Sequence, residues 1–136
     1  MKRQIAIVMA AAILGLAAPA FPHHSFAMFD REHPIKISGT IKEFQWVNPH
    51  TWIQIVVPGA GGKSVEWGIE GRSPNILARR DWTRNTLKPG DKVTLTIMPL
   101  KSGDPGGAIQ MIEFADGRTL YADTPAAVDT NEERRR

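Results

Sequence analysis

The sequence contains no cysteine among its 136 residues. Disulfide bonds, thiolate metal sites and a cysteine nucleophile are therefore excluded, and a metal site would have to use His, Met, carboxylate or backbone ligands. The chain also lacks a Gly-x-Ser-x-Gly turn, a His-Glu-x-x-His motif and a phosphate-binding glycine loop. Because no catalytic set is apparent, a non-enzymatic role is the favoured interpretation, and enzymatic activity stays an open question.

An apolar run long enough to span a membrane is also lacking. The uncharged apolar run at 5–17 is shorter than the roughly 20 residues that a spanning helix needs. A basic stretch at 2–3 precedes it and small residues at 18–20 follow it, which is the three-part layout of a secretory signal. We therefore expect residues 1–20 to be a signal peptide cleaved after Ala20, rather than an uncleaved anchor. The mature protein is then periplasmic, with no membrane span.

The chain has little net charge of either sign once the signal is removed. It contains 17 Lys and Arg against 14 Asp and Glu. Lys2 and Arg3 belong to the expected signal, and the tail at 132–136 carries the remaining excess of positive charge. A nucleic-acid-binding protein would show a clustered basic surface. The sequence therefore favours no nucleic-acid partner.

Alternation of apolar and polar residues predicts a β-rich domain. Ser73 and Pro74 can begin a short helix over residues 75–80. Three strands, a short helix and two strands follow one another in the order of a five-stranded OB-type barrel. The expected fold class is therefore all-β, a small OB-like barrel with one short helix, preceded by a signal peptide; an SH3-like barrel and a small sandwich are the alternatives. We expect strands over residues 35–46, with a bulge near Glu43, and over residues 51–57, 63–70, 92–98, 108–114 and 118–121.

These patterns divide the chain into four parts. Residues 1–20 are the expected signal peptide, and residues 21–34 form an irregular His-rich lead-in. The OB-like barrel is expected over residues 35–121. Residues 122–136 are rich in Ala, Pro, Asp, Glu and Arg, a composition that predicts a disordered tail.

Two adjacent histidines, His23 and His24, follow the expected cleavage site. Imidazole is a ligand for copper, zinc and nickel, so this pair is the first candidate metal site. Cleavage after Ala20 makes His23 the third residue, but Pro22 has no N–H, which excludes the amino-terminal copper motif that uses a deprotonated amide there. A polar, solvated leader is the alternative interpretation.

The second candidate ligand is His50, in the Asn48-Pro49-His50 turn between the first two expected strands. Loops on a rigid barrel carry binding residues, and this loop helps to form the usual ligand face of an OB barrel. We therefore expect His50 to bind metal together with His23 and His24. A loop histidine hydrogen-bonded to the backbone is the alternative.

Aromatic residues flank the same turn. Trp46 and Trp52 lie on either side of it, and with Asn48 they could form a ligand face, since aromatic rings on an OB surface stack sugars and bases. Small barrels more often use tryptophan to fill the core. Core packing is therefore the favoured interpretation of the tryptophans.

Two motifs occur together in this chain: His-His-Ser at 23–25 and Asn-Pro-His-x-Trp at 48–52. With Leu-Lys-Pro-Gly-Asp at 87–91, they resemble an uncharacterised family of exported bacterial proteins, a domain of unknown function, over about residues 23–121. The resemblance implies a periplasmic location and a small β-barrel, and it brings no established activity. It also implies that His23, His24 and His50 are the positions that matter most.

Together these features predict a periplasmic, non-enzymatic binding protein. It would hold a transition-metal ion, with copper favoured over zinc, through His23, His24 and His50. The alternative is a structural or interaction module of the cell envelope that binds a protein or glycan partner through its barrel face.

Overall fold

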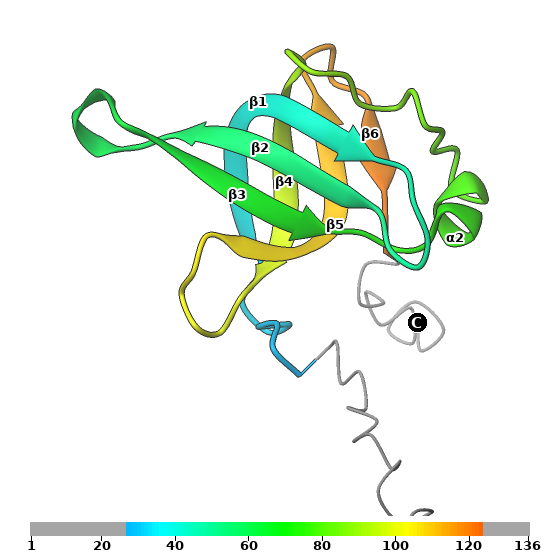
Figure 1. Cartoon of the computed structure of the whole chain (residues 1–136), viewed down its shortest axis with the longest axis horizontal. Coiled ribbons are helices and arrows are strands. Elements are labelled where there is room, and N and C mark those ends of the chain that lie inside the picture. The colour runs from blue at the N-terminus through cyan, green and yellow to red at the C-terminus, as the bar shows by residue number, and fades with distance from the viewer. Residues whose placement is uncertain (1–26, 124–136) are drawn as a thin grey trace, which may run out of the picture.

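The computed structural model describes residues 27–123. The expected signal peptide, His23, His24 and most of the expected tail lie outside this range. The described chain forms six strands and two short helical segments (Figure 1). The strands are β1 (Ile35–Gln45), β2 (Trp52–Pro58), β3 (Ser64–Glu70), β4 (Lys92–Pro99), β5 (Gly106–Phe114) and β6 (Thr119–Tyr121), with the 3-10 segment η2 (Ala60–Gly62) and the helix α2 (Pro74–Ala78) between them.

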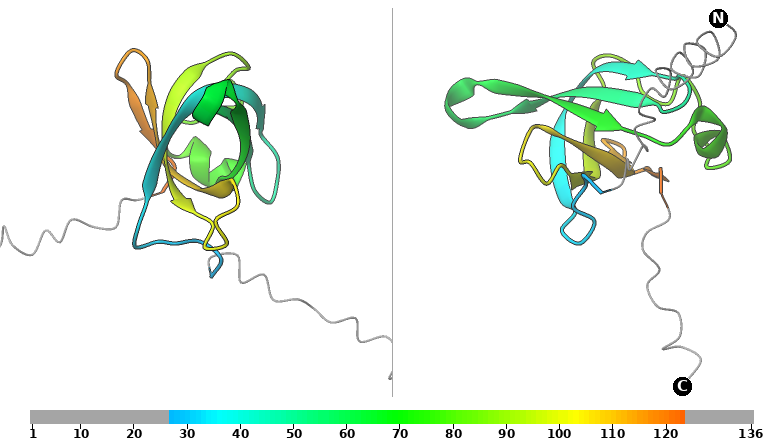
Figure 2. Two further views of the ribbon diagram at one scale, coloured as in Figure 1. Left: turned by 90° about the vertical axis from the view of Figure 1, so that its left-hand side faces the viewer. Right: turned by 60° about the horizontal axis from the view of Figure 1, so that its bottom comes forward.

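Five of the strands close into a barrel. The sheet order is β3-β2-β1-β4-β5-β6, and an additional parallel pairing joins β3 to β5. Figure 2 shows the closed ring viewed end-on, with β6 paired only to β5 outside it. This is the connectivity of an OB-type barrel, with α2 between β3 and β4. The expected all-β barrel with one short helix is confirmed.

Alternating side chains fill the barrel interior, because successive residues of a strand point to opposite faces. In β4, Val93, Leu95 and Ile97 are buried, whereas Thr94 and Thr96 between them are not. A register shift between Ile41 and Glu43 confirms the expected bulge in β1. The other strands of the barrel contribute Ile37, Ile41, Ile53, Ile55, Ile69, Ile109 and Ile112 to the same core.

The fifth strand begins two residues earlier than its side-chain pattern predicts. Gly106 and Gly107 carry no side chain that could reveal alternation, yet they pair with Gly68 and Ile69 of β3. A Cβ at Gly107 would collide with the carbonyl oxygen of Met98, and one at Gly106 would press on Leu100. Glycine is therefore needed where the start of β5 passes close to Met98 and Leu100.

The short helix plugs one end of the barrel. Leu77 of α2 and Trp82 beyond it are buried in the main core, and Trp82 Nε1 donates a hydrogen bond to the Tyr121 carbonyl (3.1 Å). The Ser73 side chain makes no capping hydrogen bond; its carbonyl accepts from the amides of Ile76 and Leu77 instead. Among residues 27–123, no helix has the length and apolar character that crossing a membrane requires.

Both ends of the described chain pack on the barrel. Phe29, in the lead-in, is 4% exposed and forms a small second core with Met98 and Ala108. At the other end, Ala122 is buried, and its amide donates to the Gln110 carbonyl (2.8 Å). The packed chain therefore extends past the expected limits of 35 and 121.

Truncating isoleucine to alanine should lower the free energy of unfolding more at a buried position than at an exposed one. Ile55 is fully buried in β2, and Ile55→Ala should lower the free energy of unfolding by about 2–5 kcal/mol through lost burial and a residual cavity. Ile35 is 38% exposed at the start of β1, so Ile35→Ala is the matched control and should cost clearly less. Urea denaturation of the two variants measures the difference; equal losses would contradict the barrel interior described above.

Candidate functional site

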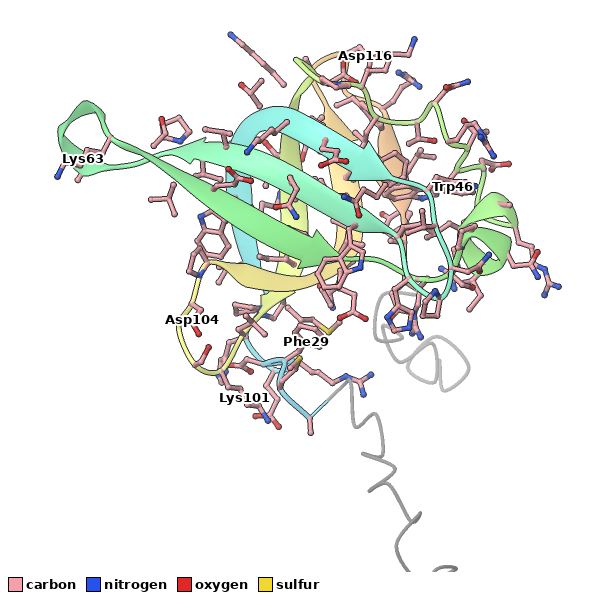
Figure 3. All side chains as sticks on the ribbon, in the orientation of Figure 1. Phe29, Trp46, Lys63, Lys101, Asp104 and Asp116 are labelled. Atoms are coloured by element: carbon pink, nitrogen blue, oxygen red, sulfur yellow. The ribbon has the colours of Figure 1, made fainter. Side chains whose placement is uncertain are left out.

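A pocket of about 160 Å³ lies where the β1–β2 loop meets the segment that follows β3. Its apolar lining comes from four places in the chain, because the lead-in, α2, β4 and β5 all reach it. Figure 3 shows Phe29 below the barrel on the short lead-in segment. The principal lining residues are Phe29, Met98 and Ile109 on the apolar side and His50, Glu70 and Asp123 on the polar side.

The central polar feature of this pocket is a histidine–carboxylate pair. His50 Nδ1 is in ion-pair contact with Glu70 Oε1. The His50 side chain is 40% exposed and that of Glu70 only 15%. A carboxylate only accepts hydrogen bonds, so Nδ1 carries the proton toward Glu70. The other ring nitrogen, Nε2, is then the one that can accept a proton or bind a metal ion.

Backbone pairing beyond the ends of β2 and β3 holds this pair in place. The buried Thr51 receives a hydrogen bond from the Gly71 amide at its carbonyl (2.8 Å). It donates to the Arg72 carbonyl through both its amide (3.2 Å) and its hydroxyl (2.9 Å). His50 immediately precedes Thr51, and Glu70 immediately precedes Gly71. The same ladder therefore sets the position of both partners.

A second ion pair also lines the pocket. The guanidinium of Arg72 donates to Asp123 Oδ2 at 2.8 Å. Asp123 belongs to the segment that its composition assigned to the tail, but here it is partly buried against the barrel. Each acidic residue that lines the pocket therefore lies next to a nitrogen-bearing side chain, Asp123 beside Arg72 and Glu70 beside His50.

The three residues of the expected ligand face separate in the fold. Trp52 is 37% exposed, and its register partner across the sheet is Glu70, so it lies on the same face as the histidine–carboxylate pair. Asn48 is exposed in the turn. Trp46 instead packs on the core, edge-to-face with Phe44 at 5.8 Å between ring centroids (Figure 3). The structure thus brings Trp52, but not Trp46, onto the face with His50.

His33, the remaining histidine of the described chain, lies in a different place. Its Nδ1 is 3.0 Å from Asp30 Oδ2 in the loop before β1, and its side chain is 76% exposed. This hydrogen bond holds the pKa of the Asp30 carboxyl below its usual value. Within residues 27–123, no three His, Asp or Glu side chains converge as a metal-binding group. His23 and His24 lie outside the described residues.

Glu70 and Thr51 are the parts of the site that the sequence pattern did not indicate. Glu70 ends an alternating strand, where carboxylates commonly face solvent, and its role depends on which residue of β2 it opposes. The register pairs Trp52 with Glu70, and this places His50 within reach. The only local signal was the polar–apolar alternation of the two strands, which leaves that register open.

Gly71 should be indispensable for the histidine–carboxylate pair. A Cβ at Gly71 would overlap Thr51 Oγ1, so Gly71→Ala should break the ladder and lower the free energy of unfolding by about 1–3 kcal/mol. It should also shift the His50 ring resonances in an NMR spectrum.

The matched control for Gly71, which directly follows β3, is Gly68→Ala within β3. A Cβ there would make only ordinary contact with the Gln54 side chain, at 3.6 Å. The His50 resonances should therefore stay in place in this variant. Identical spectra for the two variants would contradict the role given to Gly71.

Comparison with known proteins places this chain in a family. No curated protein matches the chain. A family model does match, the Family of unknown function (DUF6152), over residues 11–110. The match takes in the lead-in, the His50 turn, α2 and the barrel strands as far as the first half of β5. Because it covers most of the sequence, the chain belongs to the family DUF6152.

Proposed function

We propose that the protein is an exported, non-enzymatic binding protein that holds one transition-metal ion, with copper favoured, through His50, His23 and His24. The observation that carries this proposal is the contact between His50 Nδ1 and Glu70 at the mouth of a pocket. Metal-binding histidines characteristically present their second ring nitrogen to a carboxylate, which fixes the ring and raises its basicity. His50 has that arrangement, and its Nε2 is the ligand atom.

The path of the lead-in supports a contribution from the other two histidines. Phe29 lines the same pocket as His50, and His24 precedes it by five residues. A chain segment of that length spans up to roughly 17 Å when extended. A segment of that length would allow the imidazoles of His23 and His24 to reach the pocket, where they would complete a site that His50, positioned by Glu70, begins.

The pocket chemistry favours copper over zinc. Met98 lines the pocket beside Phe29, and a thioether is a soft ligand that suits Cu(I), whereas zinc prefers Cys, His and carboxylate ligands. With no cysteine in the chain, histidine and methionine are the softer ligands available. Export to the periplasm rests on the signal-like segment at 1–20.

Removing His50 should weaken metal binding. We expect His50→Ala to raise the dissociation constant for copper by about tenfold or more, because a direct ligand is lost. His33→Ala is the matched control, since that exposed histidine pairs with Asp30 away from the pocket, and it should leave the affinity unchanged. Competition with a chromophoric copper chelator measures both. Equal affinities in the two variants would remove His50 from the site.

Glu70 should act through His50 and not as a ligand. Glu70→Gln keeps the shape and a hydrogen-bond acceptor but removes the charge, so the affinity should fall by less than in His50→Ala, with one metal ion still bound.

The first measurement is native mass spectrometry of untagged protein purified from the periplasm. It reports the mature amino terminus and any bound ion together. A protein that stays metal-free after copper addition would contradict the proposal. The remaining candidate would then be an interaction module that binds an envelope protein or glycan, with Trp52 exposed on its face.

A further inference from the structure

The β2–β3 hairpin is longer than the barrel that it belongs to. β1 pairs with β2 only as far as Val56, opposite Thr40, and β5 pairs with β3 only along Gly68–Glu70. Figures 1 and 3 show the outer part of the hairpin, with Lys63 near its tip, projecting beyond the closed ring. Within residues 27–123, no strand therefore covers the outer edge of β3 from Ser64 to Trp67.

The direction of the backbone groups along this edge follows from one hydrogen bond. The Gly68 amide donates to the Pro105 carbonyl at 3.2 Å, which is outward from β2. Because N–H and C=O directions alternate along an antiparallel strand, those of Glu66 and Ser64 also point outward. The N–H and C=O groups of Val65 and Trp67 instead point towards β2. The open edge thus presents two amides and two carbonyls from Ser64 and Glu66.

The side chains of this segment divide between two faces. Val65 is 42% exposed and lies directly opposite Val57 of β2, on the same face as the partly buried Trp67. On the other face, Glu66 accepts a 2.7 Å hydrogen bond from Lys42 Nζ. The edge therefore combines an apolar face with a neutralised polar face.

We propose that this edge is a self-association surface, on which β3 of a second copy of the chain pairs antiparallel with Val65 opposite Val65. Outward-pointing residues must face one another in such a pair, so the register can only move in steps of two residues. Moving the second strand by two residues in one direction would place Glu66 opposite Glu66. It would also require the outer edge of Gly68, which already pairs with β5. Moving it by two residues in the other direction would require Gly62 to pair as a strand residue, although Gly62 belongs to the 3-10 segment.

The remaining register is complementary on both faces. Ser64 of each copy lies opposite Glu66 of the other, and these two hydrogen-bonded pairs would form about four backbone hydrogen bonds. The two Val65 side chains meet on the apolar face, where Lys63 of one copy lies opposite Trp67 of the other, a favourable arrangement of an ammonium and an indole ring. A twofold axis through Val65 closes the pair, so the association stops at a dimer.

A single cysteine tests the register directly, because the chain contains none of its own. Opposed residues of a non-hydrogen-bonded pair have Cα atoms about 4.5 Å apart, which is within disulfide range. In a glutathione redox buffer, Val65→Cys should form a disulfide-linked dimer. Ser102→Cys, exposed in the β4–β5 loop, is the control and should stay monomeric at the same concentration. Equal cross-linking of both variants would overturn the proposal.

A second pair of variants tests the backbone bonds without a cysteine. Glu66→Pro removes an outward amide that the barrel does not use, so the fold should survive, whereas the dimer loses two donors. Its dissociation constant by sedimentation equilibrium should rise about tenfold. Glu66→Thr, which also loses the contact with Lys42 but keeps the amide, is the control and should rise less. A wild-type protein that is monomeric at millimolar concentration, or a dimer that Glu66→Pro leaves intact, would overturn the proposal.

Discussion

The parallel pairing of β3 with β5 is the contact on which the rest of the molecule depends. It closes the ring over only a few residues, from Gly68 opposite Gly106 to Glu70 opposite Ala108. A Cβ at Gly106 would press on Leu100 and lie 3.2 Å from the Gly68 carbonyl oxygen, and one at Gly107 would collide with the Met98 carbonyl of β4. Glycine at both positions therefore lets the start of β5 fit between β3 and β4. Closure satisfies strand edges that would otherwise be open to solvent and seals a core dominated by isoleucine.

The same closure builds the pocket. Glu70 is the last residue of β3, so pairing with Ala108 sets it beside the start of β5. Ala108 and Met98 receive Phe29 from the lead-in, while the ladder from Thr51 to Arg72 brings His50 against Glu70. Residues from both ends of the described chain and from the middle thus meet at one end of the barrel. A metal site proposed there would be supported by a rigid frame, which is what precise ligand placement needs.

The position of this closure also explains why the outer part of the β2–β3 hairpin projects beyond the barrel. The outer edge of β3 pairs with β5 only near the carboxyl end of β3. The part of β2 after Val56 and the part of β3 before Gly68 therefore lie outside the ring (Figure 1). The pocket and the open edge therefore occupy opposite ends of the same two strands. Metal binding at one end and self-association at the other would use separate residues, and each can be tested with the other intact.

Local pattern in the sequence was sufficient for the strands apart from the start of β5, for the short helix and for the bulge near Glu43, because side-chain alternation and turn chemistry act over neighbouring residues. The sequence pattern also identified His50 as a candidate, because this residue lies in a turn between two strands. The partner of that histidine depended on tertiary structure, since a one-residue change of register would have turned Glu70 to the other face. The burial of Phe29 and Ala122, and the ion pair of Arg72 with Asp123, likewise join residues far apart in the chain. Such contacts follow from how the barrel closes, and no short stretch of sequence carries that information.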